Sequence, residues 1–121
     1  MKDKNFINSA LKVIEIESKA VKSLSNQIQS DFDDLCTKIL DTKGKLILMG
    51  IGKSGHIAQK ISATLSSTGT SSFFIHPTEA AHGDLGMISK QDAILILSNS
   101  GETKEIIEIL PALKRSTANI F

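Results

Sequence analysis

Cysteine and proline are both scarce in this sequence, which has one cysteine, Cys36, and two prolines in 121 residues. A single cysteine excludes a disulfide framework within the chain, and its place in an amphipathic stretch favours a small buried side chain. An excess of charge of either sign is also missing, since fourteen basic and thirteen acidic residues leave a net charge of +1. The composition excludes the basic surface typical of nucleic-acid-binding proteins and favours one modest globular domain.

Long hydrophobic runs are absent as well. The longest, residues 46–52 and 93–97, are far shorter than the roughly 20 residues that a membrane-spanning helix needs. Acids and amides are scattered through residues 1–19, so the uninterrupted apolar segment of a signal peptide is missing there. We therefore expect a soluble, cytosolic protein with no membrane partner.

Residues 6–40 repeat apolar side chains at steps of three and four, which is the period of an amphipathic helix. The repeat slips at residues 17–20, so two helices are expected rather than one long helix. Their polar faces should be solvated, although the first helix could instead pack on a partner subunit. This N-terminal helical segment is taken to cover residues 1–43.

Three short apolar runs follow, each typical of a strand that is covered on both faces. They lie at residues 45–51, 72–76 and 92–98. Residues 54–67 and 102–115 have helical spacing, and Pro111 is expected to kink or restart the second of these helices. Strands that alternate with helices predict a three-layer α/β fold, a doubly wound parallel sheet preceded by the two N-terminal helices.

The last residues, 118–121, look like the opening of a fourth strand. A doubly wound sheet of three strands and a stub would be incomplete. Residues 44–121 are therefore expected to be the front part of a larger domain: a fragment, the truncated remnant that a shortened reading frame encodes, or a piece completed by another chain.

A glycine-rich loop, residues 50–55, matches the dinucleotide-binding pattern G-x-G-x-x-G between a strand and a helix. That function also needs an acid at the end of the second strand, and residues 70–78 contain none. A nucleotide-binding P-loop fails too, because Ile47 stands where it needs a glycine. What remains is an anion site at a helix N-terminus with the Ser54 hydroxyl and the Lys53 charge, or a tight turn without a ligand.

A second loop of the same kind, residues 98–103, also lies between a strand and a helix. Its hydroxyls and amide come from Ser98, Asn99, Ser100 and Thr103. Such a set of neutral donors suits a phosphate monoester that is bound and released. One such loop would be ordinary helix capping, but two at the carboxyl ends of parallel strands should converge on one crevice.

These motifs resemble those of a known family. The sequences GIGKSGHI at 50–57, STGTSSFFIHPTEAAHGDLGMI at 67–88 and SNSGETKEI at 98–106 are similar to the sugar isomerase (SIS) domain of D-arabinose 5-phosphate isomerases. The resemblance implies interconversion of D-arabinose 5-phosphate and D-ribulose 5-phosphate, a step toward the lipopolysaccharide sugar Kdo. It implies no metal or organic cofactor and a homotetramer, in which the histidine of the 81–86 loop reaches a neighbouring subunit's site.

The same resemblance implies which residues form the site. Those expected to line the phosphate and sugar pocket are Ser54, Ser98, Asn99, Ser100 and Thr103. Those on the family's catalytic positions are Lys53, His82 and Glu105.

The residue types fit aldose–ketose isomerisation, which moves a proton between C1 and C2 through an enediolate. We assign Glu105 as the carbon base, His82 to the hydroxyl protons and Lys53 to the enediolate charge. Glu105 could instead be a structural acid at a helix N-terminus. His56 and His76 are expected to be structural or rim residues, and the three histidines lack the spacing of a metal site.

The family's SIS domain continues beyond the point where this sequence ends, supplies another catalytic histidine there and is usually followed by two CBS modules. This difference supports the expectation of a fragment. It also leaves a second function open, a non-catalytic sugar-phosphate-binding module of a regulator. A NAD-dependent enzyme is disfavoured because the ribose-binding acid is missing.

Overall fold

The computed structural model describes residues 5–116 and 119–121, which divide into two compact units after Asp34. The first unit contains α1 (Phe6–Ser23), the single 3₁₀ turn η1 (Leu24–Asn26) and the start of α2 (Ser30–Asp41). Asn5 caps α1, because its side-chain oxygen accepts the backbone N–H of Asn8 at 3.0 Å. No residue of α1 is buried.

The two predicted N-terminal helices are present, but the break predicted at residues 17–20 is wrong. α1 runs through this stretch with an ion pair between Lys19 Nζ and Glu15 Oε1 at 2.6 Å. No residue of the helix is buried, so a slip in apolar spacing there does not change what the helix buries. The chain leaves the helical path only at residues 24–29, where serine and asparagine favour turns.

The second unit, from Leu35 onward, is built on a parallel four-stranded sheet in the order β2-β1-β3-β4. Its strands are β1 (Leu46–Gly50), β2 (Ser72–Phe74), β3 (Ala93–Leu97) and β4 (Asn119–Ile120). The three predicted strands are confirmed, and the expected fourth strand pairs with β3, although Ala118 lies outside the described residues. The predicted division of the chain at residue 43 stays a prediction.

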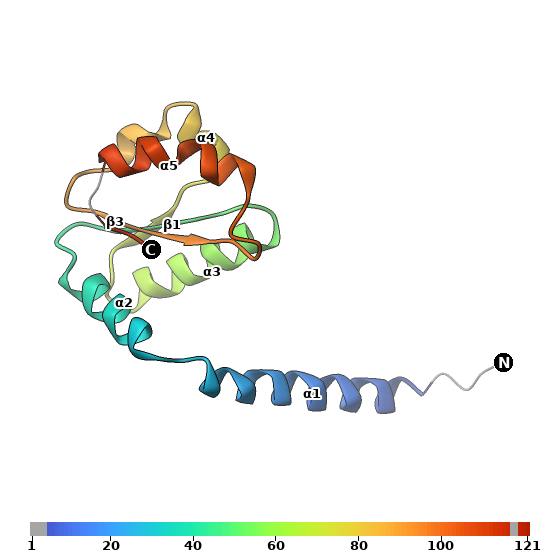
Figure 1. The fold of residues 1–121 in the computed structure, drawn as a ribbon. Coiled ribbons are helices and arrows are strands. Elements are labelled where there is room, and N and C mark those ends of the chain that lie inside the picture. Colours follow the sequence, from blue (N-terminus) through green and yellow to red (C-terminus); the bar gives the residue numbers. More distant parts are fainter. Residues whose placement is uncertain (1–4, 117–118) are drawn as a thin grey trace. The chain divides into compact units, whose positions relative to one another are not determined.

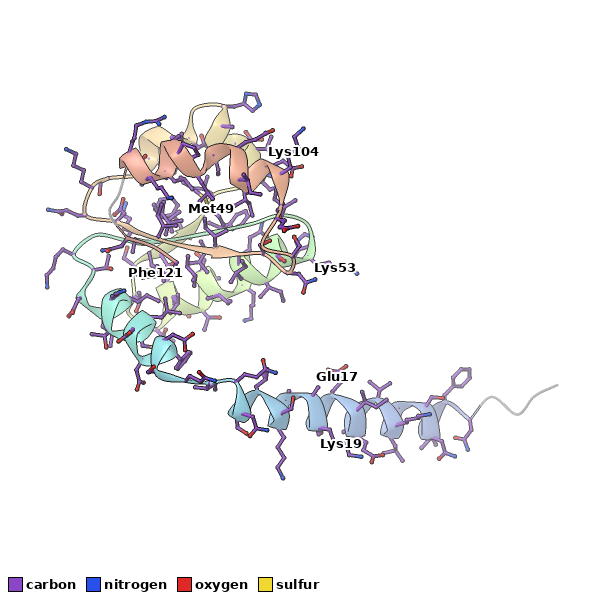
Figure 2. All side chains as sticks on the ribbon, in the orientation of Figure 1. Glu17, Lys19, Met49, Lys53, Lys104 and Phe121 are labelled. Carbon is purple, nitrogen blue, oxygen red and sulfur yellow. The ribbon has the colours of Figure 1, made fainter. Side chains whose placement is uncertain are left out.

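Helices cover both faces of this sheet, which confirms the three-layer α/β fold (Figure 1). One face packs on α4 (Pro77–Ala81) and α5 (Lys104–Ser116), and the other on α3 (Lys53–Ser67). Side chains of β1 alternate between the layers, since Ile47 and Met49 join the first cluster while Leu46 and Leu48 join the second. Figure 2 shows Met49 between the sheet and α5.

Two features of the structure differ from the sequence prediction. The segment between β2 and β3, for which the sequence predicted no helix, contains α4 and the 3₁₀ helix η2 (Asp84–Met87). The second difference is that α5 continues through Pro111 as one helix and is not restarted there. Proline removes the hydrogen bond to the carbonyl of Ile107, but both residues are exposed, so water can satisfy that carbonyl.

At the amino ends of the strands, the carboxylate of Asp92 joins two segments far apart in sequence. Its Oδ1 accepts the backbone N–H of Lys45 and its Oδ2 that of Ser89, each at 2.7 Å. Burial alone would raise the pKa of Asp92, but these two backbone donors, with the charge of Lys45, lower it below the ordinary value. The ionised carboxylate thus holds the start of β1 against the loop before β3.

Asp92→Asn should destabilise the fold by about 1.5–3 kcal/mol, the usual cost of losing a hydrogen bond to a charged group. The amide retains one acceptor but turns its NH₂ group toward a backbone donor. Because the folded-state pKa is lowered, the carboxylate's contribution is present above its unfolded pKa and is lost as the pH falls through the folded value. Urea unfolding at neutral and acidic pH measures both effects. Asp41→Asn, at an exposed site, is the control, and equal midpoints for the two variants would contradict the prediction.

Candidate phosphosugar site

The first glycine loop brings β1 and α3 into direct backbone contact. A Cβ added at Gly55 would lie 2.7 Å from the Gly50 carbonyl oxygen, so neither glycine leaves room for a side chain. Gly52, just before α3, has a φ of 59°, a backbone conformation that favours glycine. All three glycines are therefore required by the tight strand-to-helix turn itself, and the pattern needs no dinucleotide to explain it.

This turn leaves the N-terminus of α3 available to an anion. No side chain caps the helix, which begins at Lys53 after Gly52. The first turn therefore offers backbone N–H groups and the positive end of the helix dipole. Lys53 is exposed and Ser54 is half-buried at this end. Figure 2 shows Lys53 and Lys104 at the same end of the second unit, where α3 and α5 begin.

The second loop is held together by its own hydroxyl groups. Ser98 Oγ accepts the backbone N–H of Gly101 at 3.0 Å, and Ser100 Oγ accepts that of Glu102 at 3.1 Å. Ser98 Oγ also lies 2.9 Å from Thr103 Oγ1, and either hydroxyl can be the donor. The hydroxyls fold the loop and still retain protons for a ligand.

A count of those protons shows what the loop can offer an anion. The Ser98–Thr103 pair has two hydroxyl protons and uses one of them between its own oxygens. The other is free to point outward, and the Ser100 hydroxyl, which only accepts, can donate as well. The loop can therefore present at least two neutral hydroxyl donors, which suits a phosphate that must also be released.

The two loops open onto one cleft of about 620 Å³, a volume within the range of small-molecule sites. Its predicted residues are Lys53, Ser54, Ser98 and Asn99. The carboxyl ends of β1 and β3 are neighbours in the sheet, so the loops that follow them meet at one edge. The structure thus brings half of the predicted site residues into one cavity.

The cavity has an apolar wall that the sequence analysis missed. Ile57 of α3 and Ile96 and Leu97 of β3 line it beside the polar groups. Ile57 is 57% exposed, unusual for a large apolar side chain on a helix that packs against a sheet. Ile57 lies one helical turn after Lys53, so the two side chains share a face of α3. This spacing could have predicted from sequence that Ile57 lines the same cavity as Lys53.

The other predicted residues do not line this cavity. Ser100 and Thr103 belong to the same loop as Ser98, while Glu105 is exposed in the first turn of α5. His82 is the exposed C-terminal cap residue of α4, where its backbone N–H donates to the Glu79 carbonyl at 3.0 Å. Since α4 and α5 cover the sheet face opposite α3, His82 and Glu105 belong to another layer of the fold than Lys53 and Ser54.

Within residues 5–116 and 119–121, no three or more His, Cys, Asp or Glu side chains gather as a metal site would require. In the same part of the chain no helix is both long and apolar enough to cross a bilayer.

Comparison with known proteins decides the family. A sequence profile of the SIS domain matches residues 38–121. The chain belongs to the SIS domain family. The match includes both glycine and serine loops, so the family assignment made from these motifs is confirmed.

Several relatives of this SIS chain are arabinose 5-phosphate isomerases. The chain is 54% identical over 111 residues to the enzyme of Pseudomonas aeruginosa and 49% identical to that of Escherichia coli. Each alignment covers 92% of this chain and 34% of the relative, so the chain spans about a third of their length. An Escherichia coli protein solved in complex with arabinose 5-phosphate matches 99% of this chain and 64% of its own, with 44% identity and a TM-score of 0.89.

Proposed function

We propose that the protein carrying this chain interconverts D-arabinose 5-phosphate and D-ribulose 5-phosphate. The observation that carries the proposal is the cleft with Lys53, Ser54, Ser98 and Asn99, in a chain 54% identical to an arabinose 5-phosphate isomerase. The α3 N-terminus and the 98–103 loop hold the phosphate. As in the family, the D-arabinose 5-phosphate formed would supply synthesis of the lipopolysaccharide sugar Kdo in the cytosol.

The chemistry assigns one task to each catalytic candidate. Glu105 removes a proton from C1 of the ketose and returns it to C2. The carbonyl group thereby moves from C2 to C1 through a cis-enediolate. Lys53 stabilises the negative oxygen of that intermediate, because it lies beside the cleft with its ammonium exposed. His82 moves the hydroxyl protons between O1 and O2, and it reaches the cleft of a neighbouring subunit in a homotetramer.

A second function, binding without catalysis, is favoured by one specific observation. Neither Glu105 nor His82 lines the cleft in the described structure, whereas three of the five phosphate-binding candidates, Ser54, Ser98 and Asn99, do. A regulatory SIS module would need only the latter. The two functions differ in whether the bound sugar exchanges protons with solvent.

A chimera tests the proposal directly. In it this chain replaces the aligned third of the Pseudomonas aeruginosa isomerase, which supplies the remaining length. The proposal predicts that D-arabinose 5-phosphate is converted to the ketose, and that in D₂O a solvent deuteron enters at C1 or C2. Binding of the sugar phosphate with neither conversion nor exchange would establish the regulatory module instead.

In that chimera, Ser100→Ala should weaken sugar-phosphate binding by about 1–3 kcal/mol, the range for losing a donor to a charged group. The hydroxyl accepts only the Glu102 amide within the loop, so its own proton is available to the phosphate. Calorimetric titration measures the affinity. Ser67→Ala at the far end of α3, where the hydroxyl donates to the Thr64 carbonyl, is the control. An affinity equal to that of the control would exclude Ser100 from the phosphate site.

A further inference from the structure

The short helix α4 carries His82 at one end and a second histidine, His76, at the other. His76 is half-buried and is the N-terminal cap residue of this five-residue helix. Its ring nitrogen Nδ1 accepts the backbone N–H of Thr78 at 3.2 Å. Serine, threonine, aspartate and asparagine are the usual cap residues, so a histidine in this role is uncommon.

The backbone of the helix depends on the same residue. The His76 carbonyl accepts the Ala80 amide at 3.0 Å, and at the other end of the helix the His82 amide donates to the Glu79 carbonyl, also at 3.0 Å. Burial of Pro77 and Ala80 holds the first turn of α4 on the core, whereas His82 at the other end is exposed. A helix of one turn has few backbone hydrogen bonds, so the bond at its cap is a large share of those that order this exposed end.

The His76 ring is itself held in place by the strand before it. Its centroid lies 6.4 Å from that of Phe74, with the two planes at 75°, an edge-to-face contact. Phe74 in turn lies against the first glycine loop, since a Cβ added at Gly55 would be 3.7 Å from Phe74 Cζ. His76 thus connects the loop that carries Lys53 with the helix that carries His82.

We propose that His76 is a positioning residue, which fixes His82 for proton transfer through the α4 cap and touches no substrate. This inference rests on the proposed isomerase function for the role of His82. The structural part of the inference does not rest on that function. It says that the segment ending at His82 depends on a hydrogen-bond acceptor at position 76, and its evidence is the set of contacts described above. The acceptor role also requires Nδ1 to be unprotonated, with the ring proton on Nε2.

Two substitutions separate the cap from the packing of the ring. His76→Phe keeps an aromatic ring beside Phe74 but has no acceptor, whereas His76→Asn loses the ring and supplies an acceptor oxygen at a preferred cap residue. In the chimera, His76→Phe should lower kcat on the order of tenfold, the factor by which loss of one cap shifts a local equilibrium, with KM unchanged. His76→Asn should restore most of the turnover.

Amide exchange measured by NMR in the 121-residue chain tests the same inference without any turnover. The Ala80 and His82 amides should exchange faster in His76→Phe than in the unsubstituted chain, and His76→Asn should restore their protection. Equal exchange rates in all three proteins, or an equal loss of protection in both variants, would contradict the role of the His76 cap. An unsubstituted chimera that does not isomerise the sugar would contradict the proposed function, and the exchange measurement would still decide the role of His76.

Discussion

Glu105→Gln should lower turnover of D-arabinose 5-phosphate in the chimera by roughly 10²–10⁴-fold, the usual cost of losing a general base. Glutamine keeps the size of the side chain and part of its hydrogen bonding, so substrate affinity and folding should change little. Glu105 is exposed in the first turn of α5 and is free of any packing role that the substitution would disturb. Turnover, calorimetric affinity and melting temperature are measured on the same sample.

Glu108→Gln is the matched control, because this acid is exposed on the same helix one turn further on. Its only described charge contact is with Lys104, at 3.8 Å and on the surface, where an ion pair contributes little. A merely structural Glu105 would behave like an acid at a helix N-terminus, costing about 0.3–1 kcal/mol of stability with turnover intact. A Glu105→Gln variant that melts early but turns over normally would transfer the base role to His82.

The sheet and its layers could be predicted from sequence because each buried strand leaves an unambiguous signal. The run 46–50 is apolar at every position, and every one of its residues is buried. A short apolar run bounded by turn residues is typical of a strand covered on both faces, because such a strand needs apolar side chains on both sides. A helix with no buried residue, such as α1, leaves no comparable constraint, and its end was misplaced for that reason.

The helix α4 was missed because it is one turn long and has too few residues to show a period. A local signal was nevertheless present, since Pro77 occupies the first helical position and the preceding His76 is confined to extended backbone. Pro77 is also fully buried, which fixes the start of the helix against the core. Reading that dipeptide as a helix start would have found it.

Only the part of the site that the loops after β1 and β3 carry could be predicted from sequence. Adjacent parallel strands send their loops to one edge, which is enough to bring Lys53 and Ser54 to Ser98 and Asn99. Spacing along the chain does not say which face of the sheet a later helix will cover. Glu105 begins one helix and His82 ends another, both on the face opposite α3, and only the three-dimensional packing shows this.

Lys53→Met should lower kcat for the isomerisation by roughly 10²–10³-fold, the range for removing one group that stabilises an oxyanion. Methionine keeps the apolar stem of the side chain and removes the charge. Lys53 is exposed and begins α3 after a backbone turn that the glycines determine, so the fold should not depend on its side chain. Steady-state kinetics of the chimera, with the melting temperature as a check, measures the effect.

Lys60→Met on the same helix is the control, since this exposed lysine is outside the cleft and has the same charge. The division between kcat and KM then identifies the oxygen that Lys53 contacts. The enediolate oxygen carries its full charge only as the reaction proceeds, so a lysine directed at it lowers kcat and leaves KM nearly unchanged. The phosphate is charged throughout, and a lysine that binds it would raise KM with kcat intact. That second result would place Lys53 with Ser54 in the phosphate site and leave the enediolate without a cation from this loop.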